Sequence, residues 1–393
     1  MFLEILLAIL LGVVAGCFTG LMPGIHTNLI AVMLVSSSGL ILEFFSINFL
    51  VGFIIAMSIT HSFTNTIPSI YLGAPEPSTA LNVLPGHKLL MEGEGLNAVK
   101  LTLLGSMLGL LICFIMYPVL KLFIRLSYNF LSSNIPIIMV VIGIFLITRT
   151  SDWKTNALIY VSSAIVGILV LNSKIDNPLF PMLSGFFGIS TLAFSLTDDS
   201  KIPLQKKDGF GYIVSKTSLM LGALSGFITS ILPGLGSSTA AAISSSIKKE
   251  DDTKNFLFMM GSISTVNFFM SIAALSIIDK GRNGSIVAIM NITNEYNIAL
   301  MVSASLISAG IAISTSRKIA EWFEVIALKL DYKKLVVSVI MLILVMTIIL
   351  TGIMGLIIVI CCSVIGLYSN YKGTPRNLMM ACIMVPVSLF FIF

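Results

Sequence analysis

The sequence predicts an all-α polytopic integral membrane protein, and three observations lead to this fold class. Hydrophobic residues form 56% of the 393 residues and charged residues only 10%, whereas an ordinary soluble domain has about 25% charged residues. The apolar residues stand in long uninterrupted runs, and a helix needs roughly 20 of them to cross a bilayer. Strands of a membrane β-barrel would instead alternate polar and apolar residues. The runs therefore indicate helices.

The apolar runs follow one another along the whole chain. The pieces 25–42 and 235–247 are too short for an ordinary span and resemble half-helices or re-entrant arms. We therefore expect about 12 transmembrane helices, within a range of 10–14. The runs, in order, cover residues 3–22, 25–42, 47–73, 99–120, 134–149, 156–172, 179–196, 214–232, 235–247, 255–278, 296–315, 335–352, 354–369 and 376–393.

Two polar loops and one charged stretch interrupt this pattern. The loops cover residues 74–98 and 197–212. The stretch 317–334, RKIAEWFEVIALKLDYKK, mixes charges with Trp322 and Phe323, which predicts an amphipathic helix at the membrane surface. Its lysines favour the cytoplasmic side of the membrane.

An internal repeat joins two distant parts of the chain. LGVVAGCFTGLMPGI (11–25) aligns without gaps with LGALSGFITSILPGL (221–235), at an offset of 210 residues. A weaker echo pairs Asn65 with Asn267. The matched residues of the main alignment include Gly12 with Gly222, Gly16 with Gly226, Thr19 with Thr229, and Pro23-Gly24 with Pro233-Gly234.

The repeat predicts the domain organisation. We expect a first half at 1–130, connecting helices at 131–212, a second half at 213–350 and C-terminal helices at 351–393. By analogy with other secondary transporters, we expect the halves to be inverted, related by a pseudo-two-fold axis in the membrane plane.

The two Pro-Gly pairs break transmembrane segments at corresponding places. Proline removes a backbone donor and glycine adds backbone freedom, so together they end a helix. Freed backbone groups inside a bilayer must be buried in protein or line a wet cavity, and a helix that restarts there points its positive end at an anion. We therefore expect a midplane substrate site at these breaks. Its residues are Pro23, Gly24, Ile25, His26, Thr27, Asn28 and Asn65 from the first half, and Pro233, Gly234, Leu235, Gly236, Ser237, Ser238, Thr239 and Asn267 from the second.

Structural explanations compete with this interpretation. A Pro-Gly kink can simply pack against a neighbouring helix, and small residues four apart, as at Gly12 and Gly16, favour close helix packing. His26 and His61 are each either hydrogen-bonded structural residues or proton carriers. Asn65 and Asn267 are either interhelical hydrogen-bonding groups or substrate ligands.

The segments around the breaks carry charges only near their starts, at Glu4 and Lys216. Intramembrane charges normally mark ion pathways, so backbone dipoles must neutralise most of the substrate charge. Candidates for proton coupling are His26, His61 and Glu76. Oxygen atoms are abundant, and hard cations prefer them, so we expect Na⁺ as the coupling ion and no other cofactor.

Other function classes lack their signatures. The chain has no GxSxG, HExxH or Walker motif, no cysteine pattern for a metal site, and no basic block typical of nucleic-acid binding. We therefore expect neither an enzyme nor a resident metal. Membrane lipids are the expected partners of the net charge of +5.

With these motifs in view, the chain resembles the large permease subunit of tripartite tricarboxylate transporters, in particular its archaeal branch. The resemblance rests on GLMPGIHTN (20–28), ILPGLGSST (231–239), the loop 75–99 and FPMLSGFFGIS (180–190). It implies a substrate pathway in this chain, a small membrane subunit, an extracytoplasmic binding protein and import of carboxylates driven by an ion gradient. One departure is His26, where the family's usual first motif has glycine.

We expect a secondary transporter in the cell membrane that moves a small organic anion, with a carboxylate as the leading class. The alternative is a translocase for an anionic polyprenyl-phosphate lipid, because bacterial polyprenyl-phosphate translocases also resemble a pair of Pro-Gly-turn repeats. A membrane scaffold without transport is the third possibility. The sequence leaves open the substrate, the direction, the absolute topology and the oligomeric state.

Overall fold

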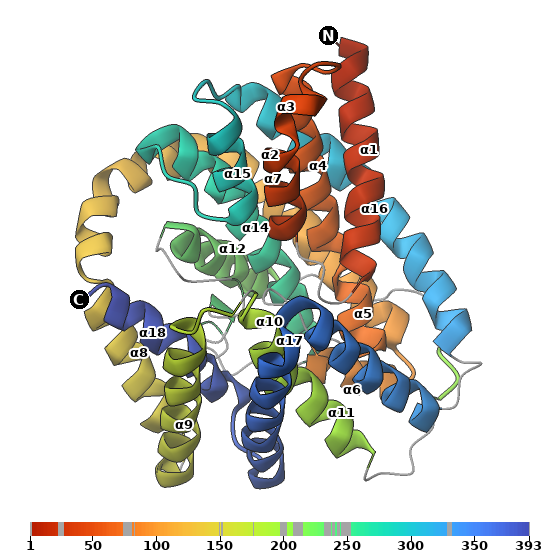
Figure 1. Ribbon diagram of the computed structural model, residues 1–393, viewed down its shortest axis with the longest axis vertical. Helices are drawn as coiled ribbons and strands as arrows, with labels where there is room; N and C mark the ends of the chain where they lie inside the picture. Colours follow the sequence, from red (N-terminus) through yellow and green to blue (C-terminus); the bar gives the residue numbers. More distant parts are fainter. Residues whose placement is uncertain are drawn as a thin grey trace.

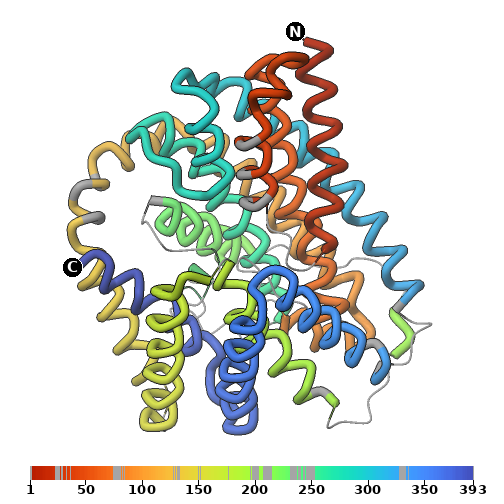
Figure 2. Tube along the Cα trace, in the orientation of Figure 1, coloured from red at the N-terminus to blue at the C-terminus, as the bar shows by residue number. Residues whose placement is uncertain are grey.

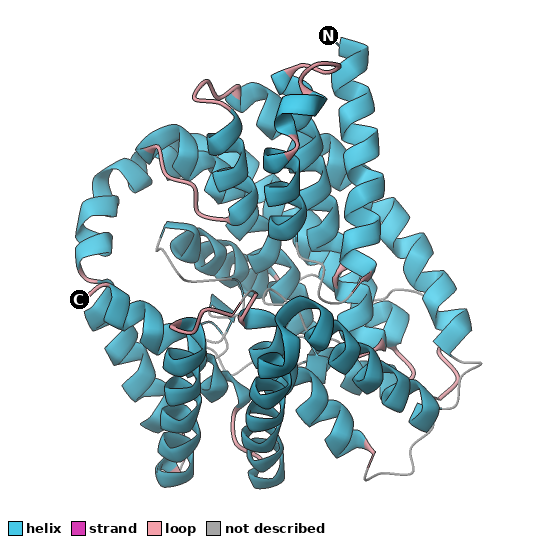
Figure 3. Cartoon of the chain, viewed as in Figure 1, coloured by secondary structure: helices cyan, strands magenta, loops and turns pink. Residues whose placement is uncertain are grey.

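The computed structural model describes most of the chain, with gaps around the two Pro-Gly motifs and in several loops. The described residues are 2–22, 27–73, 81, 83–148, 150, 152–175, 177–196, 203–206, 215–231, 237, 240–241, 244, 253–327 and 332–392. All regular structure in these residues is helical, and Figure 3 shows it as helices joined by loops. The all-α class is confirmed.

The helices of the N-terminal part cover the first third of the chain. They are α1 (Phe2–Leu21), α2 (Thr27–Ser36), α3 (Ser38–Ile41), α4 (Ile47–Thr64), α5 (Thr66–Tyr71), α6 (Val83–Met91), α7 (Gly95–Ser133) and α8 (Ile135–Thr148). Most of these helices lie where the apolar runs predict them.

The remaining helices continue the pattern. They are α9 (Trp153–Leu171), α10 (Leu179–Leu183), the π-helix η2 (Ser184–Ile189), α11 (Ser190–Ser195), α12 (Lys216–Ile231), α14 (Thr253–Ile278), α15 (Gly284–Ile292), α16 (Ile298–Ala327), α17 (Tyr332–Lys372), the 3₁₀-helix η3 (Arg376–Met380) and α18 (Ala381–Phe390). In Figures 1 and 2, α1 to α4 and α15 occupy the upper part of the view, and α8, α9, α11 and α17 the lower part.

Seven of the described helical stretches are long and apolar enough to cross a membrane. They contain α1, α4 with α5, α7, α9, α14, α16 and α17, and shorter apolar stretches contain α8, α10 to α11 and η3 to α18. A polytopic membrane protein is thereby confirmed. The expected total of about 12 crossings stays a prediction.

Helices α4 and α14 form the centre of the molecule. In α4–α5 and α14, 78% and 67% of the most apolar window is buried, against 33% or less in the other five spans. Helix α1 packs on α4 and α12 packs on α14. Helices α7 and α16 complete the centre, since α7 packs on α14 and α16 on α4. The outer helices expose large apolar side chains, such as Leu3, Leu169 and Ile349, which suits contact with lipid.

Two stretches differ from the sequence prediction. The expected surface helix at 317–334 is not separate, because α16 continues through it as far as Ala327. No glycine or proline stands in that part of the chain to stop the helix, and Arg317 pairs with Glu321 one turn further on. The predicted runs 335–352 and 354–369 lie in α17, where Gly352 has a φ of 67° and interrupts the helix.

A short piece of the second polar loop fastens the turn between α6 and α7. The Gln205 side chain accepts a hydrogen bond from the Gly95 amide (2.8 Å) and donates to the Leu90 carbonyl (3.2 Å). Next to it, Glu94 pairs with Lys254 (2.5 Å) and Lys206 (3.6 Å). The hydrogen bond from Lys254 is the main cause that lowers the pKa of the Glu94 carboxyl. The loop thus ties α7 to the start of α14.

Candidate functional site

The first predicted break lies between α1 and α2. Helix α1 ends at Leu21 and α2 begins at Thr27. The predicted site residues Pro23, Gly24, Ile25 and His26 lie outside the described residues. Thr27 is buried at the start of α2, with 5% of its surface exposed. Asn28 belongs to the same first turn, and its side chain is outside the description.

The second predicted break follows α12, which ends at Ile231. Pro233, Gly234, Leu235, Gly236, Ser238 and Thr239 lie outside the described residues, whereas Ser237 is helical and buried. Further on, the Ser244 hydroxyl contacts Ser225 of α12 at 2.5 Å. Ser244 therefore lies beside α12.

Glycines bring each of these helices close to a central helix. A Cβ atom on Gly12 would lie 2.6 Å from the Phe53 carbonyl oxygen, and one on Gly16 would lie 2.5 Å from that of Met57. Such distances are too short for any side chain, so both positions require glycine. Close packing of α1 on α4 is therefore confirmed.

The second half repeats this contact. A Cβ atom on Gly222 would lie 2.9 Å from the Met259 carbonyl oxygen, and one on Gly226 would lie 2.9 Å from that of Ile263. The glycines of the two halves are 210 positions apart. Their contacts on α4 and α14 are 206 positions apart, as Met57 and Ile263 illustrate.

One polar contact stands near the end of each of the two outer helices. In the first half, the ring Nδ1 of His61 lies 3.1 Å from the Thr19 hydroxyl, and both residues are only 3% exposed. In the second half, the Asn267 amide donates to the Thr229 hydroxyl over 3.0 Å. These pairs have the same offsets as the glycine contacts, which differs from the sequence echo that pairs Asn65 with Asn267.

The two threonine hydroxyl groups also donate hydrogen bonds within their own helices. Thr19 donates to the Gly16 carbonyl and Thr229 to the Ser225 carbonyl (3.3 and 2.9 Å). With its own hydrogen committed, the Thr229 hydroxyl serves Asn267 as an acceptor, and the Thr19 hydroxyl lies within hydrogen-bond distance of the His61 ring.

Proline adds a further feature at the same place. In an α-helix the carbonyl of residue i accepts from the amide of residue i+4, and proline has no amide hydrogen. Pro23 and Pro233 follow Thr19 and Thr229 by four positions. The backbone carbonyls of both threonines thus lack their ordinary helical donor, beside the hydroxyl contacts.

The other predicted residues are placed only in part. Asn65 is buried, and its backbone N–H caps α4 by donating to the His61 backbone carbonyl at 2.9 Å. A Cβ atom on Gly20 would lie 3.1 Å from the Asn65 nitrogen, so Asn65 stands beside the end of α1. Glu76 lies outside the described residues. No cluster of three or more His, Cys, Asp or Glu side chains occurs among the residues that the structure places.

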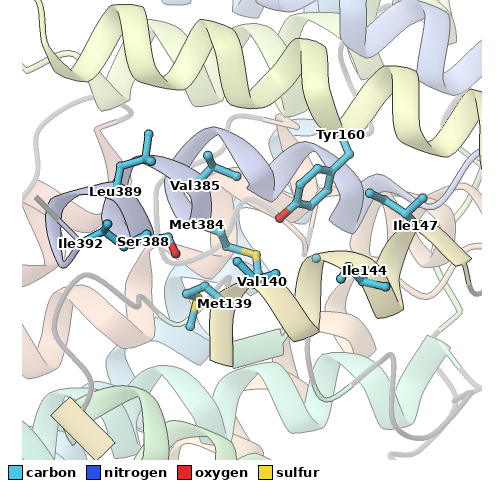
Figure 4. A pocket seen from close by; sticks show the side chains of 11 residues that line it. Met139, Val140, Ile144, Ile147, Tyr160, Met384, Val385, Ser388, Leu389 and Ile392 are labelled. Carbon is cyan, nitrogen blue, oxygen red and sulfur yellow. The ribbon is translucent and has the colours of Figure 1, made fainter. Parts of the chain in front are cut away.

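A separate crevice of about 230 Å³ lies between α8, α9 and α18. Figure 4 shows its mostly apolar lining, including Met139, Ile144 and Met384, together with the hydroxyl of Tyr160. None of the predicted site residues lines it. Val140 and Ile144 are more than half exposed, so this crevice opens toward the expected lipid side.

Comparison with known proteins gives a consistent result across almost the whole chain. The model of the tripartite tricarboxylate transporter TctA family matches residues 6–381. An uncharacterized protein of Methanocaldococcus jannaschii is 32% identical over 388 residues, which cover 95% of this chain and 96% of the relative. No solved structure matches the chain.

Proposed function

The chain belongs to the tripartite tricarboxylate transporter TctA family, and from this premise we propose that it is a secondary transporter for a small organic anion of the carboxylate class. The match to a transporter family and the seven apolar helices support a multi-pass membrane transporter rather than an enzyme. The protein would lie in the cell membrane. Its substrate would bind between the two helix N-termini that follow the Pro-Gly pairs.

The observation that carries this proposal is the matched pair of contacts next to the breaks. Thr19 with His61 and Thr229 with Asn267 hold the two outer helices on the two central helices in the same way. The threonine of each pair stands four residues before a proline, so its backbone carbonyl lacks the amide donor that an unbroken helix would supply. Interrupted helices in corresponding positions of two halves mark the substrate site of many secondary transporters.

The packing of the helices supports the relation between the halves. Helix α7 of the first half packs on α14 of the second, and α16 of the second packs on α4 of the first. Such an exchange is what a two-fold relation would produce. We infer that α1, α4 and α7 correspond to α12, α14 and α16, and that the axis lies in the membrane plane.

The coupling ion we propose is Na⁺. The carbonyls of Thr19 and Thr229 and the nearby hydroxyls are oxygen ligands of the kind that hard cations prefer. His61 is held against Thr19 in a buried contact, which supports a structural role for this ring. A proton route through His26 or Glu76 is the competing possibility.

The family name implies a three-part system. We propose that a small membrane subunit and an extracytoplasmic binding protein work with this chain. The binding protein would deliver the anion to the cavity between the halves.

Uptake into proteoliposomes tests the proposal. We expect citrate or a smaller carboxylate to accumulate when a Na⁺ gradient is imposed at equal pH, with the accessory proteins added if the chain alone is inactive. Asn267→Ala should reduce uptake, whereas Ser388→Ala, in the separate crevice, should leave it unchanged. Translocation of polyprenyl phosphate without carboxylate uptake would refute the proposal in favour of a lipid translocase. Uptake driven by a pH gradient in Na⁺-free buffer would refute the Na⁺ coupling.

A further inference from the structure

A sharp turn after α17 brings one arginine back into the protein. Gly373 has a φ of 63° and its amide donates to the Asn370 carbonyl (3.1 Å). The Thr374 amide then donates to the Ser369 carbonyl (3.1 Å), and Pro375 starts η3. The chain therefore reverses within a few residues, and Arg376 lies beside α17 instead of beyond its end.

The guanidinium of Arg376 has only neutral partners. Its Nε donates to the Asn370 side-chain oxygen (3.2 Å), and its Nη2 donates to the Thr191 hydroxyl. The Nη1 atom is buried without a hydrogen-bond partner. No Asp or Glu among the residues that the structure describes lies within ion-pair distance of this group.

Both partners of the guanidinium are held by other contacts. The Thr191 hydroxyl donates to the Phe187 carbonyl (2.5 Å), and the Asn370 amide donates to the Ser190 carbonyl (3.1 Å). Phe187 belongs to the π-helix η2, and single π-turns inside helices are frequent at functional sites. The guanidinium is thus fixed in place by acceptors that themselves carry no charge.

The guanidinium of Arg376 has N–H donors left over for a ligand. A guanidinium has five N–H groups, and the two hydrogen bonds to Asn370 and Thr191 use one each on Nε and Nη2. Two N–H groups on Nη1 and one on Nη2 remain, which is the arrangement that grips a carboxylate or phosphate with two parallel hydrogen bonds. A buried charge without a counter-ion is unfavourable, so an anion would also relieve this cost.

The position of the group relates it to the first half of the chain. Leu192 follows Thr191, and its Cδ2 would lie 2.8 Å from a Cβ atom on Gly73. Gly73 stands just after α5, which continues the central helix α4. Arg376 therefore lies where the C-terminal helices meet the first half, and it does not line the crevice between α8, α9 and α18.

We propose that Arg376, held by Asn370 and Thr191, is the anchor of an oxyanion-binding site between α17, α11 and η3. The ligand is a carboxylate or a phosphate group. It comes either from a small anion in solution or from an anionic lipid headgroup, and the guanidinium would recognise both in the same way. This site is outside the helix breaks and stands without the proposed transport function.

Thermal unfolding of the purified protein tests the site without any transport assay. In chloride buffer, citrate or inorganic phosphate added at constant ionic strength should raise the melting temperature of the wild type. In parallel, nanodiscs with phosphatidylglycerol should stabilise it relative to phosphatidylcholine if the source is a lipid. Arg376→Met should lose the stabilisation in whichever arm shows it, with a half-maximal concentration at least about tenfold higher. Arg317→Met, which removes an exposed guanidinium paired with Glu321, should keep the wild-type response.

A second variant keeps the arginine and supplies a charge of its own. Asn370→Asp places a carboxylate 3.2 Å from Nε, so it should weaken the response to added oxyanions even if Arg376→Met does not fold. The proposal is overturned if no arm stabilises the wild type more than sodium chloride does. It is also overturned if Arg376→Met, or in its absence Asn370→Asp, responds as the wild type.

Discussion

The contacts next to the two helix breaks allow two double-mutant cycles, and the structure predicts which of them gives the larger coupling energy. The first cycle combines Thr229→Val with Asn267→Leu, and the second combines Thr19→Val with His61→Leu. Valine keeps the shape of threonine and removes only the hydroxyl. In each single threonine variant, a polar side chain of the central helix loses its acceptor.

The expected magnitudes follow from burial. Interhelical hydrogen bonds in a membrane protein couple by about 0.6 kcal/mol on average and by about 1.7 kcal/mol at most. Thr19 and His61 are both 3% exposed, so water cannot replace the lost hydrogen bond and the coupling should approach the upper value. Asn267 is only half-buried, so water can replace the lost acceptor and the coupling with Thr229 should lie near the average.

The assay is reversible unfolding in mixed micelles with increasing SDS, followed by circular dichroism. Free energies from the wild type, the two single variants and the double variant give the coupling in each half. A larger coupling for the half-buried pair would contradict the burial argument. Zero coupling in both pairs would remove these contacts from the account of how the outer helices are held.

Two further predictions concern packing and pH. Gly12→Val and Gly222→Val should each destabilise the protein by about 1–3 kcal/mol through overpacking, whereas Gly310→Ala, with open space around it, should not; equal melting temperatures for all three would refute the packing argument. His87 lies in α6, outside the candidate spans, and burial lowers the pKa of its imidazole. Between the lowered pKa and about pH 6.5, the imidazole is therefore protonated in the unfolded chain but neutral in the folded protein. The contribution of His87 to the free energy of unfolding should be constant above about pH 6.5 and should decrease as the pH falls toward the lowered pKa. Melting curves at pH 8 to 5 should show a smaller decline for His87→Gln, and an unchanged decline would exclude His87 as its cause.

The helices could be predicted closely because uninterrupted apolar runs leave little choice inside a bilayer. The run 255–278 corresponds to α14 at Thr253–Ile278, and the run 3–22 to α1 at Phe2–Leu21. The helix predicted at 317–334 is present as far as Ala327 but is continuous with α16, since charges indicate a surface location but do not end a helix; the surface location stays a prediction. Gly352, with its positive φ, interrupts α17 where the sequence also placed a break.

The polar contacts were harder to predict because their role depends on geometry and not on residue type. Matching identical letters paired Asn65 with Asn267, whereas the contacts pair His61 with Asn267. An imidazole and an amide can each donate one hydrogen bond to a threonine. Comparing residue types in the two halves therefore does not show that His61 and Asn267 make equivalent contacts. The offset of the glycine contacts carries the missing information, and it needs the structure.

Arg376 was overlooked for a different reason. It stands in the polar stretch YKGTPRN, which reads as an ordinary loop between two apolar runs. The turn at Gly373 is what places the side chain next to Asn370 and Thr191. A lone arginine after a Gly-x-Pro turn, directly before an apolar run, is the one signal that could have indicated a buried position.

The distribution of charge in the molecule has an energetic reason. Along α1 and α12, each threonine hydroxyl donates to its own helix and also contacts a polar side chain of a central helix, so the tight glycine contacts need no charged group. A fixed charge there would have to be desolvated in every state of the protein, at a cost that no described carboxylate or amine offsets. An anion that enters the centre must then be balanced by helix ends and backbone dipoles, which carry partial charges at no desolvation cost. A full positive charge is instead kept at Arg376, where hydrogen bonds to Asn370 and Thr191 hold it while Nη1 has no hydrogen-bond partner.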